Sequence, residues 1–254
     1  MKILMLTDES DMFYHILLEA LNNIDATVGH SSMDISDSDI SQFDPDVIIH
    51  NSEKTDVVKY KDAISIGVNE IDSPSCFSYR NESSKNYIEP FIRITDQDLH
   101  DVRYKSDIVY VGSPSLLPDC VSEFQSDSSI NFKIIHNTNI PITNYCGACQ
   151  FENYKKFFNM SKCVLVNKPS PEESKISFKL LDVIYSGGNP VIHDSDDKFV
   201  EDIRDALDGK SFRGDFISKA EIKERYTNYD RMSDILLKIG LNKLSKMVLE
   251  SKGK

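Results

Sequence analysis

Residues 160–194 of the chain, MSKCVLVNKPSPEESKISFKLLDVIYSGGNPVIHD, decide the fold. The apolar run 162–166 is rich in β-branched residues and is followed by a loop with two prolines, which is typical of a buried parallel strand. Ser174 is expected to cap the helix that follows, and a Gly-Gly pair to end it before a second strand at 191–193. The start of this helix therefore lies at the carboxyl edge of a parallel sheet, where open α/β folds bind their ligands.

The same alternation of strands and helices runs through the whole chain and predicts an α/β protein. A chain of 254 residues has room for two compact domains. We expect domains at 1–105 and 106–215 and a helical tail at 216–254. Further strands are expected at 2–6, 25–29, 46–50, 63–67, 90–94, 107–111 and 131–135, with helices at 12–21, 118–126, 150–159, 198–207, 218–225 and 230–249. Residues 31–46 are expected to form a loop with room for one short helical turn.

Composition limits the classes of protein to which the chain can belong. The 40% hydrophobic content supports well-formed cores, and no apolar run approaches 18 residues. We therefore expect no membrane-spanning helix, and no signal peptide because the first residues run straight into a strand. The five cysteines are odd in number and not densely spaced, which favours a reducing compartment, here taken as the cytoplasm.

The charge of the chain is strongly acidic and unevenly placed. The formal net charge is −12, and the residues up to Lys105 contain 9 Lys and Arg against 20 Asp and Glu. The first half therefore carries almost all of the excess. Because contact with a nucleic-acid backbone relies on clustered Lys and Arg, this half is not expected to make many such contacts.

The helix at the centre of the deciding stretch carries a motif that begins at Ser177. The pattern is a small residue, then Lys179, then Asp182, followed by Gly-Gly-x-Pro-Val-Ile from Gly187. It resembles the nucleotide-sugar site of GT-B glycosyltransferases, although that family more often has Arg and Glu at these two positions. The alternative is an ordinary amphipathic helix with a solvated Lys and Asp.

The resemblance implies an architecture and a set of roles. Two Rossmann-like domains of GT-B type would face each other across a cleft, with the C-terminal helices crossing back to the first domain. Lys179 would pair with the donor diphosphate, and Asp182 would hold the ribose hydroxyls. A UDP-sugar would be the favoured donor and co-substrate.

Other stretches are similar to particular glycosyltransferases. Residues 107–113 (DIVYVGS) and 131–137, with the deciding stretch, look like the donor half of phage DNA β-glucosyltransferases, and 46–51 and 69–74 look like two strand ends of their acceptor half. The tail segment 225–232, RYTNYDRM, resembles that of CgeB-type bacterial glycosyltransferases. The expected donor-binding residues are Gly112, Ser113, His136, Asn137, Gly147, Ser177, Lys179 and Asp182.

The donor loop departs from the phage enzymes in one respect. Gly112 would let backbone N–H groups approach a diphosphate, although a plain strand-to-helix turn has the same sequence. The phage enzymes place arginines in this loop, whereas residues 114–118 contain none. Lysines such as Lys168, Lys175 or Lys179 would then have to supply the charge.

Three acids are candidates for the catalytic base. Direct displacement at a sugar carbon needs a group that takes the proton of the acceptor hydroxyl. Glu70 matches the base of the phage enzymes by position, Asp72 follows in the same loop, and Asp8 follows the first strand. Each could equally be a solvated loop carboxylate. His50 and His136 also end strands, where a lone histidine is more often structural.

No metal site is expected. Asp194-Ser195-Asp196 matches a metal-binding motif in letters, but it is interpreted as the cap of the next helix. The Cys146/Cys149 pair lacks the second pair that a structural zinc site needs, and it lies in a loop unsuited to a redox motif. Mg²⁺ remains compatible with a diphosphate ligand but is not implied.

The hypothesis at this point is a glycosyltransferase that moves a sugar from a nucleotide-sugar donor to a hydroxyl acceptor, by inverting single displacement as the resemblance implies. The acceptor is a hydroxymethylated DNA base or a smaller molecule. The alternative is a catalytically silent GT-B-like protein that binds a nucleotide or sugar. No membrane partner is expected, and the oligomeric state stays open.

Overall fold

A computed structural model of the chain describes most of its residues and divides it into two compact units. Unit 1 comprises residues 1–94, 171–175 and 225–254, and unit 2 comprises 95–170 and 176–224. The described residues are 1–7, 12–22, 24–32, 34–50, 63–69, 76–78, 91–93, 98–136, 145–146, 149, 151–167 and 177–252.

Unit 1 is built on a five-stranded sheet in which every pair of neighbours is parallel, in the order β2-β1-β3-β4-β5. The strands β1 and β3 are almost wholly buried, as expected for a parallel sheet covered on both faces. Their bounds are β1 Lys2–Leu6, β2 Thr27–Ser31, β3 Val47–His50, β4 Ile64–Asn69 and β5 Cys76–Ser78.

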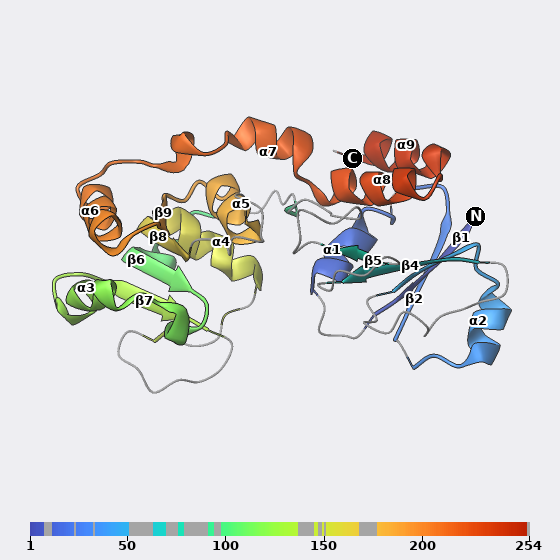
Figure 1. Ribbon diagram of the computed structural model, residues 1–254, viewed down its shortest axis with the longest axis horizontal. Coiled ribbons are helices and arrows are strands. Elements are labelled where there is room, and N and C mark those ends of the chain that lie inside the picture. The colour runs from blue at the N-terminus through green and yellow to red at the C-terminus, as the bar shows by residue number, and fades with distance from the viewer. Residues whose placement is uncertain are drawn as a thin grey trace. The chain divides into compact units, whose positions relative to one another are not determined.

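Helices from both ends of the chain belong to unit 1 (Figure 1). Helix α2 (Asp37–Phe43) covers one face of the sheet, where Ile40 packs with Leu4, Leu6 and Ile48. Helix α8 (Asn228–Lys238) contacts α1 (Met12–Glu19), and the Asn228 side chain donates a hydrogen bond of 2.9 Å to the Ile16 carbonyl. Helix α9 (Asn242–Ser251) packs on α8.

Three sequence expectations for unit 1 need correction. The single helix expected at 230–249 is two helices, because Gly240 adopts a left-handed φ of 83° that ends α8. The expected loop at 31–46 contains α2, whose first turn is capped by the Ser36 hydroxyl. The expected strand at 90–94 contributes only a bridge within its described part, where Ile92 pairs with Thr227.

The 225–232 segment is held by unit 1 through several interactions. The backbone of Ile92 bonds to Tyr226 and Asn228 at 2.7 and 3.0 Å. Thr227 and Asp230 form a capping box at the start of α8, and Lys252 lies 2.7 Å from the same carboxylate. These interactions hold the start of α8 against the rest of unit 1.

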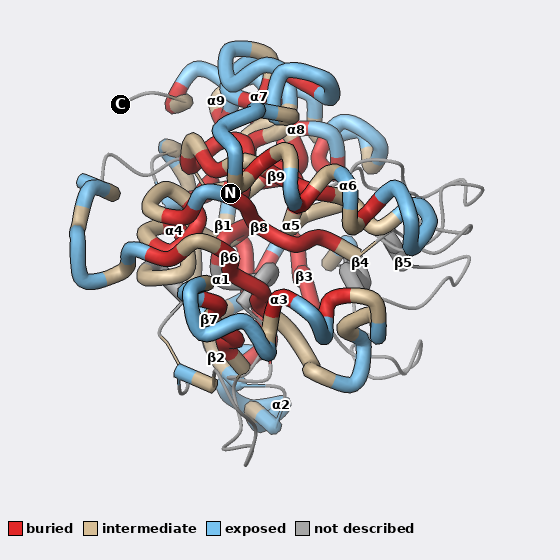
Figure 2. Tube along the Cα trace, turned by 90° about the vertical axis from the view of Figure 1, so that its left-hand side faces the viewer, coloured by how far each residue is buried: buried red, intermediate tan, exposed pale blue. Residues whose placement is uncertain are grey.

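Unit 2 contains a four-stranded parallel sheet in the order β7-β6-β8-β9. The strands β6 and β8 lie at its centre and are buried along most of their lengths (Figure 2). The elements are β6 Ser106–Val111, β7 Phe132–Ile135, β8 Ser161–Asn167, β9 Pro190–His193, α3 Ser122–Ser126, α4 Phe151–Met160, α5 Phe178–Tyr185, α6 Asp196–Leu207, α7 Lys219–Arg225, and the 3₁₀ turns η1 Val102–Tyr104, η2 Pro114–Leu116, η3 Asp119–Val121 and η4 Arg213–Asp215.

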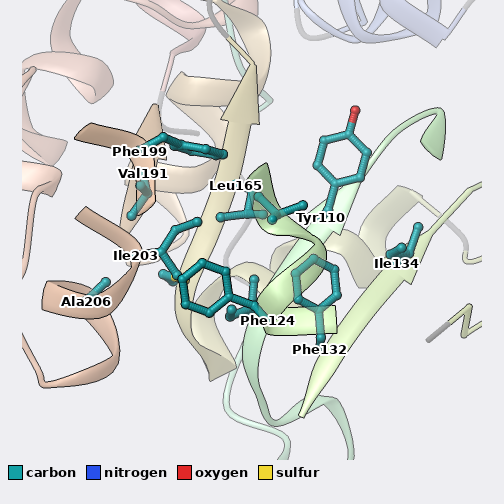
Figure 3. Close-up of a cluster of buried hydrophobic side chains, with 12 residues drawn as sticks. Tyr110, Phe124, Phe132, Ile134, Leu165, Val191, Phe199, Ile203 and Ala206 are labelled. Atoms are coloured by element: carbon teal, nitrogen blue, oxygen red, sulfur yellow. The ribbon is translucent and has the colours of Figure 1, made fainter. Parts of the chain in front are cut away.

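Helices cover both faces of this sheet and form two separate cores. On one face, Phe124 of α3 and Phe199 and Ile203 of α6 pack against Phe132 and Leu165 (Figure 3). On the other face, side chains of α4 and α5 pack against the alternate strand residues, which include Val109, Val111, Phe157, Phe158, Val164 and Val183. Unit 2 is therefore a three-layer α/β/α structure.

The strand orders confirm the prediction of two parallel α/β units. In each sheet the strand that comes first in the chain lies between the second and the third: β1 lies between β2 and β3, and β6 lies between β7 and β8. The order of the strands therefore reverses direction beside β1 and beside β6. Ligands of open α/β sheets bind at the carboxyl ends of the strands at such a reversal. None of the described helices has the length and apolar character needed to cross a membrane.

Candidate functional site

The reversal in unit 2 lies between β6 and β8, and Gly112 follows β6 at this point. Its φ is 145°, a conformation that favours glycine. A Cβ atom here would lie 3.1 Å from the Tyr110 hydroxyl oxygen and 3.3 Å from the Lys179 amine. The missing side chain therefore leaves room for these two polar groups to meet at the main chain.

Lys179 reaches this turn from the first residues of α5. Its half-buried side chain donates a hydrogen bond to the carbonyl oxygen of Val111 and lies 5.2 Å from the centre of the Tyr110 ring. Burial lowers the pKa of the Lys179 amine to about 8. The amine is therefore mostly charged at pH 7, and two of its three N–H groups remain for other acceptors.

The helix that carries Lys179 begins later than the sequence predicts. Its N-cap is Ser177, whose hydroxyl accepts a hydrogen bond of 3.2 Å from the Leu180 N–H, whereas Ser174 lies outside the described residues. The positive end of the helix dipole adds to the charge of Lys179 at the carboxyl edge of the sheet. An anionic group bound at this edge would be stabilised by both.

Asn167 is a site residue that the sequence reasoning missed. At the end of β8, its amide donates hydrogen bonds of 3.1 Å to the Tyr110 hydroxyl and to the Leu116 carbonyl. Its side-chain oxygen is buried and accepts no hydrogen bond from the described residues. A buried acceptor without a donor is unfavourable, so this oxygen is ready to accept from a ligand hydroxyl. A polar residue at the end of a central strand was the signal that would have identified it.

Asp182 lies one turn beyond Lys179 and faces α4. Its Oδ1 atom lies 3.6 Å from the Lys155 amine, which is too far for a hydrogen bond, and both side chains are largely buried. Burial raises the pKa of Asp182, and the charge of Lys155 opposes that rise. Lys155 itself lies 5.5 Å from the centre of the Tyr185 ring. The structure therefore gives Asp182 an internal partner, while its predicted contact with ribose stays a prediction.

Two further donor-site candidates, His136 and Ser113, follow the ends of β7 and β6. His136 follows this strand, and its carbonyl accepts a hydrogen bond of 3.2 Å from the Tyr145 hydroxyl. The Gly112 N–H donates to Ile135 at 3.0 Å, so the ends of β6 and β7 are joined. Ser113 follows directly and accepts a bond of 3.2 Å at its carbonyl from Tyr110. Asn137 and Gly147 lie outside the described residues.

The structure brings Gly112, Ser113 and Lys179 together with Tyr110 and Asn167. Ser177 stands at the start of the same helix, and His136 at the end of the neighbouring edge strand. The result is a cationic, hydrogen-bonding edge that suits an anionic ligand.

The candidate bases lie outside the described residues. In the sequence Glu70 directly follows the end of β4, Asp72 comes two residues later, and Asp8 comes shortly after the end of β1, so their assignment stays a prediction. At the same edge of the sheet the structure describes His50, which ends β3 and pairs in register with Leu6 of β1 and Gly67 of β4. Its ring is buried, its Nδ1 atom has no hydrogen-bond partner in the described part of the chain, and burial lowers its pKa.

The chain was compared with known proteins. No protein-family model matches it, and neither does any curated protein sequence. Among solved structures, an α1,3-fucosyltransferase matches with a TM-score of 0.47 at 10% identity, over 87% of this chain and 88% of that chain. The glycosyltransferase SnogD from Streptomyces nogalater also matches at 0.47 and 10%, over 94% and 100%. A 2-hydroxyacid dehydrogenase family protein from Aeromonas salmonicida has a TM-score of 0.21 at 9% identity, over 83% and 97%. The fold described above rests on the strand orders of the two sheets.

Proposed function

We propose that the chain is a nucleotide-sugar-dependent glycosyltransferase whose unit 2 binds the donor at the carboxyl ends of β6 and β8. The observation that carries the proposal is the position of Lys179, which brings an ammonium group from the start of α5 to the Gly112 turn at the reversal of the sheet. A diphosphate is the natural ligand of such a cationic helix start. The motif that begins at Ser177 supports a nucleotide sugar, with a UDP-sugar favoured.

In this proposal each residue of the edge has a role in donor binding. Lys179 and the first turn of α5 neutralise the diphosphate, and Gly112 allows the main chain to approach it. The side-chain oxygen of Asn167, which accepts no hydrogen bond from any described residue, accepts one from a donor hydroxyl, and this adds a residue to those expected from sequence. Ser113, His136, Asn137, Gly147, Ser177 and Asp182 complete the proposed donor set.

The reaction needs a base as well as a donor. We assign this role to Glu70, with Asp72 and Asp8 as alternatives in unit 1. The base removes the proton of the acceptor hydroxyl as its oxygen bonds to the anomeric carbon, and the bond from that carbon to the diphosphate breaks. The diphosphate leaves with the bonding electrons, and its growing charge is stabilised by Lys179. This single displacement inverts the configuration of the sugar.

Two observations disagree about the nature of the acceptor. Resemblance points to a hydroxymethylated base in DNA, whereas the acidic first half opposes contact with phosphates. Flipping a base also requires a grip on the flanking backbone. A smaller hydroxyl compound satisfies the same chemistry without that requirement, so both acceptors belong in the proposal.

One observation favours the second candidate, a silent nucleotide- or sugar-binding protein. The two charged side chains of the motif already have internal partners, since Lys179 bonds to the Val111 carbonyl and Asp182 lies beside Lys155. The segment 113–121 also contributes no Lys or Arg. The protein could then bind a donor but lack the positive charge that stabilises the departing diphosphate.

A panel of UDP- and GDP-sugars separates these readings. Binding is measured by calorimetry, and transfer by the mass increase of hydroxymethylated DNA and of small hydroxyl acceptors. Saturable binding with transfer of the sugar supports the enzyme, whereas binding without transfer to any acceptor supports the silent protein. Absence of binding to every nucleotide sugar of the panel would contradict the enzyme, and it would contradict the silent protein as well if free nucleotides and sugars also fail to bind.

A further inference from the structure

Three metal-binding side chains meet at the carboxyl end of β9, outside the proposed donor set. They are Cys120 of η3, His193 at the end of β9, and Asp196 at the start of α6. The Cys120 sulfur, a ring nitrogen of His193 and a carboxylate oxygen of Asp196 all lie within 4.8 Å of one another. In the sequence Cys120 is remote from the other two, so only the fold brings the three together.

The three ligand atoms lie close enough for one small cation after shifts of about 1 Å. Tetrahedral Zn²⁺ binds sulfur at about 2.3 Å and nitrogen or oxygen at about 2.0–2.2 Å, which places its ligand atoms about 3.3–3.7 Å apart. His193 Nε2 and Asp196 Oδ1 are now 2.7 Å apart, as a hydrogen-bonded pair. An ion would therefore have to separate them by less than about 1 Å. The Asp196 side chain is 70% exposed, so it is free to make this movement.

Two of the three ligands are held in place by the core of unit 2. The His193 ring packs edge-on against Phe199, with 4.9 Å between ring centres, and Phe199 is fully buried. Cys120 packs against the same core cluster. A fixed thiol and imidazole with one mobile carboxylate form a partly preorganised site, which lowers the cost of binding an ion.

A reactive cysteine is the rival explanation for this cluster. A nucleophilic or redox cysteine needs a lowered pKa, usually from a nearby cation. Here the charged group beside the Cys120 sulfur is the Asp196 carboxylate, an anion. The partner of the imidazole is Asp196, whose carboxylate faces both of the other groups. This geometry does not suit a nucleophile.

We propose that Cys120, His193 and Asp196 bind a divalent ion of the zinc class, with a fourth position open to water or a ligand. Thiolate, imidazole and carboxylate together suit Zn²⁺ rather than Mg²⁺, which prefers oxygen ligands. The ion would tie η3 to β9 and to the start of α6. This site departs from the expectation that the chain has no metal site.

The position of the site gives the ion a structural consequence. His193 is the register partner of Asn167 in the sheet, and neighbouring strands lie about 4.8 Å apart. Cys120 lies at the end of the segment that begins at Gly112. Within this segment, the Leu116 carbonyl accepts a hydrogen bond from the Asn167 amide. A metal at Cys120 and His193 would therefore fix the Cys120 end of this segment to β9, the strand next to the one that carries Asn167.

The test is a cobalt titration of the whole chain after treatment with a chelator. Co²⁺ in a tetrahedral site with a thiolate gives visible d–d bands and a near-ultraviolet charge-transfer band. We expect both bands at one equivalent of Co²⁺ and their loss when Zn²⁺ is added. Cys120→Ser should abolish the charge-transfer band, and His193→Gln and Asp196→Asn should each weaken Co²⁺ binding by roughly tenfold or more.

Matched variants separate the site from adventitious binding. Cys146→Ser removes an exposed thiol, and Asp197→Asn removes an exposed acid next to a proposed ligand. Both should keep the spectrum and affinity of the unaltered chain, and circular dichroism checks that every variant is folded. A chain without a charge-transfer band, or a band that persists in Cys120→Ser, would overturn the proposal. Because the readout is spectroscopic, its failure is distinct from a failure to bind nucleotide sugars.

Discussion

Replacement of Lys179 is the sharpest test of the donor site. Lys179→Ala removes the ammonium group at the Gly112 turn, and with it a charge-assisted hydrogen bond worth about 1.5–3 kcal/mol. UDP-glucose should therefore bind roughly 10- to 150-fold more weakly. Lys162→Ala is the matched control, because it removes the same charge from unit 2 at the opposite, amino end of β8. Calorimetry with both variants measures the difference.

The lowered pKa of Lys179 adds a dependence on pH with a definite sign. With a pKa of about 8, the charged fraction falls from about nine-tenths at pH 7 to about one-tenth at pH 9. Binding of UDP-glucose, whose diphosphate does not titrate in this range, should weaken about tenfold between these values. Lys179→Arg should bind as well as the unaltered chain at pH 7 and keep its affinity at pH 9, because arginine stays charged.

Two results together would contradict the role of Lys179 in donor binding. Lys179→Ala would bind UDP-glucose as tightly as Lys162→Ala, and the affinity of the unaltered chain would not change between pH 7 and pH 9. The Lys179 ammonium would then have only a structural role, through its hydrogen bond to the Val111 carbonyl. In that case the diphosphate would have to bind elsewhere on the chain.

Three further predictions address the base, the acceptor and the tail. Glu70→Gln should lower turnover by about two to four orders of magnitude while donor binding persists. Normal turnover in Glu70→Gln together with lost turnover in Asp8→Asn would instead assign the base to the loop after the first strand. Asp72→Asn is the second comparison. In a fluorescence titration, binding to hydroxymethylated duplex should be weak and vanish by about 0.2 M salt; tight binding at that salt would contradict the charge argument. Thr227→Ala removes a buried helix cap and should cost about 1–2 kcal/mol in urea unfolding followed by circular dichroism, whereas an exposed control such as Ser38→Ala should cost much less.

The architecture was predictable because its signal is local. Apolar runs such as 107–111 and 162–166 are buried strands in the structure, and alternation with helices dictates a parallel sheet. Element ends were less predictable. Ser174 and Ser177 are both good caps by residue type, and in the structure Ser177 is the N-cap of α5. The break at Gly240 inside an otherwise periodic helix was likewise set by one backbone conformation.

The candidate site was predictable only where a residue lies within a recognisable motif. Gly112 and Lys179 were expected at the donor edge, and the structure places their atoms side by side. Asn167 carries one sequence signal, its place at the end of a central strand, but its contacts with Tyr110 and Leu116 are with residues distant in sequence and could not be predicted. The cluster at Cys120 could not be foreseen for the same reason, since sequence spacing identifies metal ligands only when they lie on one element or in adjacent turns.

The enzyme and the silent protein make different demands on Lys179. An enzyme must bind the transition state more tightly than the donor, and charge on the departing diphosphate grows as the sugar bond breaks. Lys179→Ala should then lower the rate of transfer by a larger factor than it weakens binding of UDP-glucose. A silent protein has no such transition state, so the loss would be confined to binding. Because segment 113–121 supplies no cation, the charge of Lys179 is where this difference should be largest. Equal losses in the rate at saturating donor for Lys179→Ala and Lys162→Ala would show that any catalysis by this chain draws its electrostatic stabilisation from another residue.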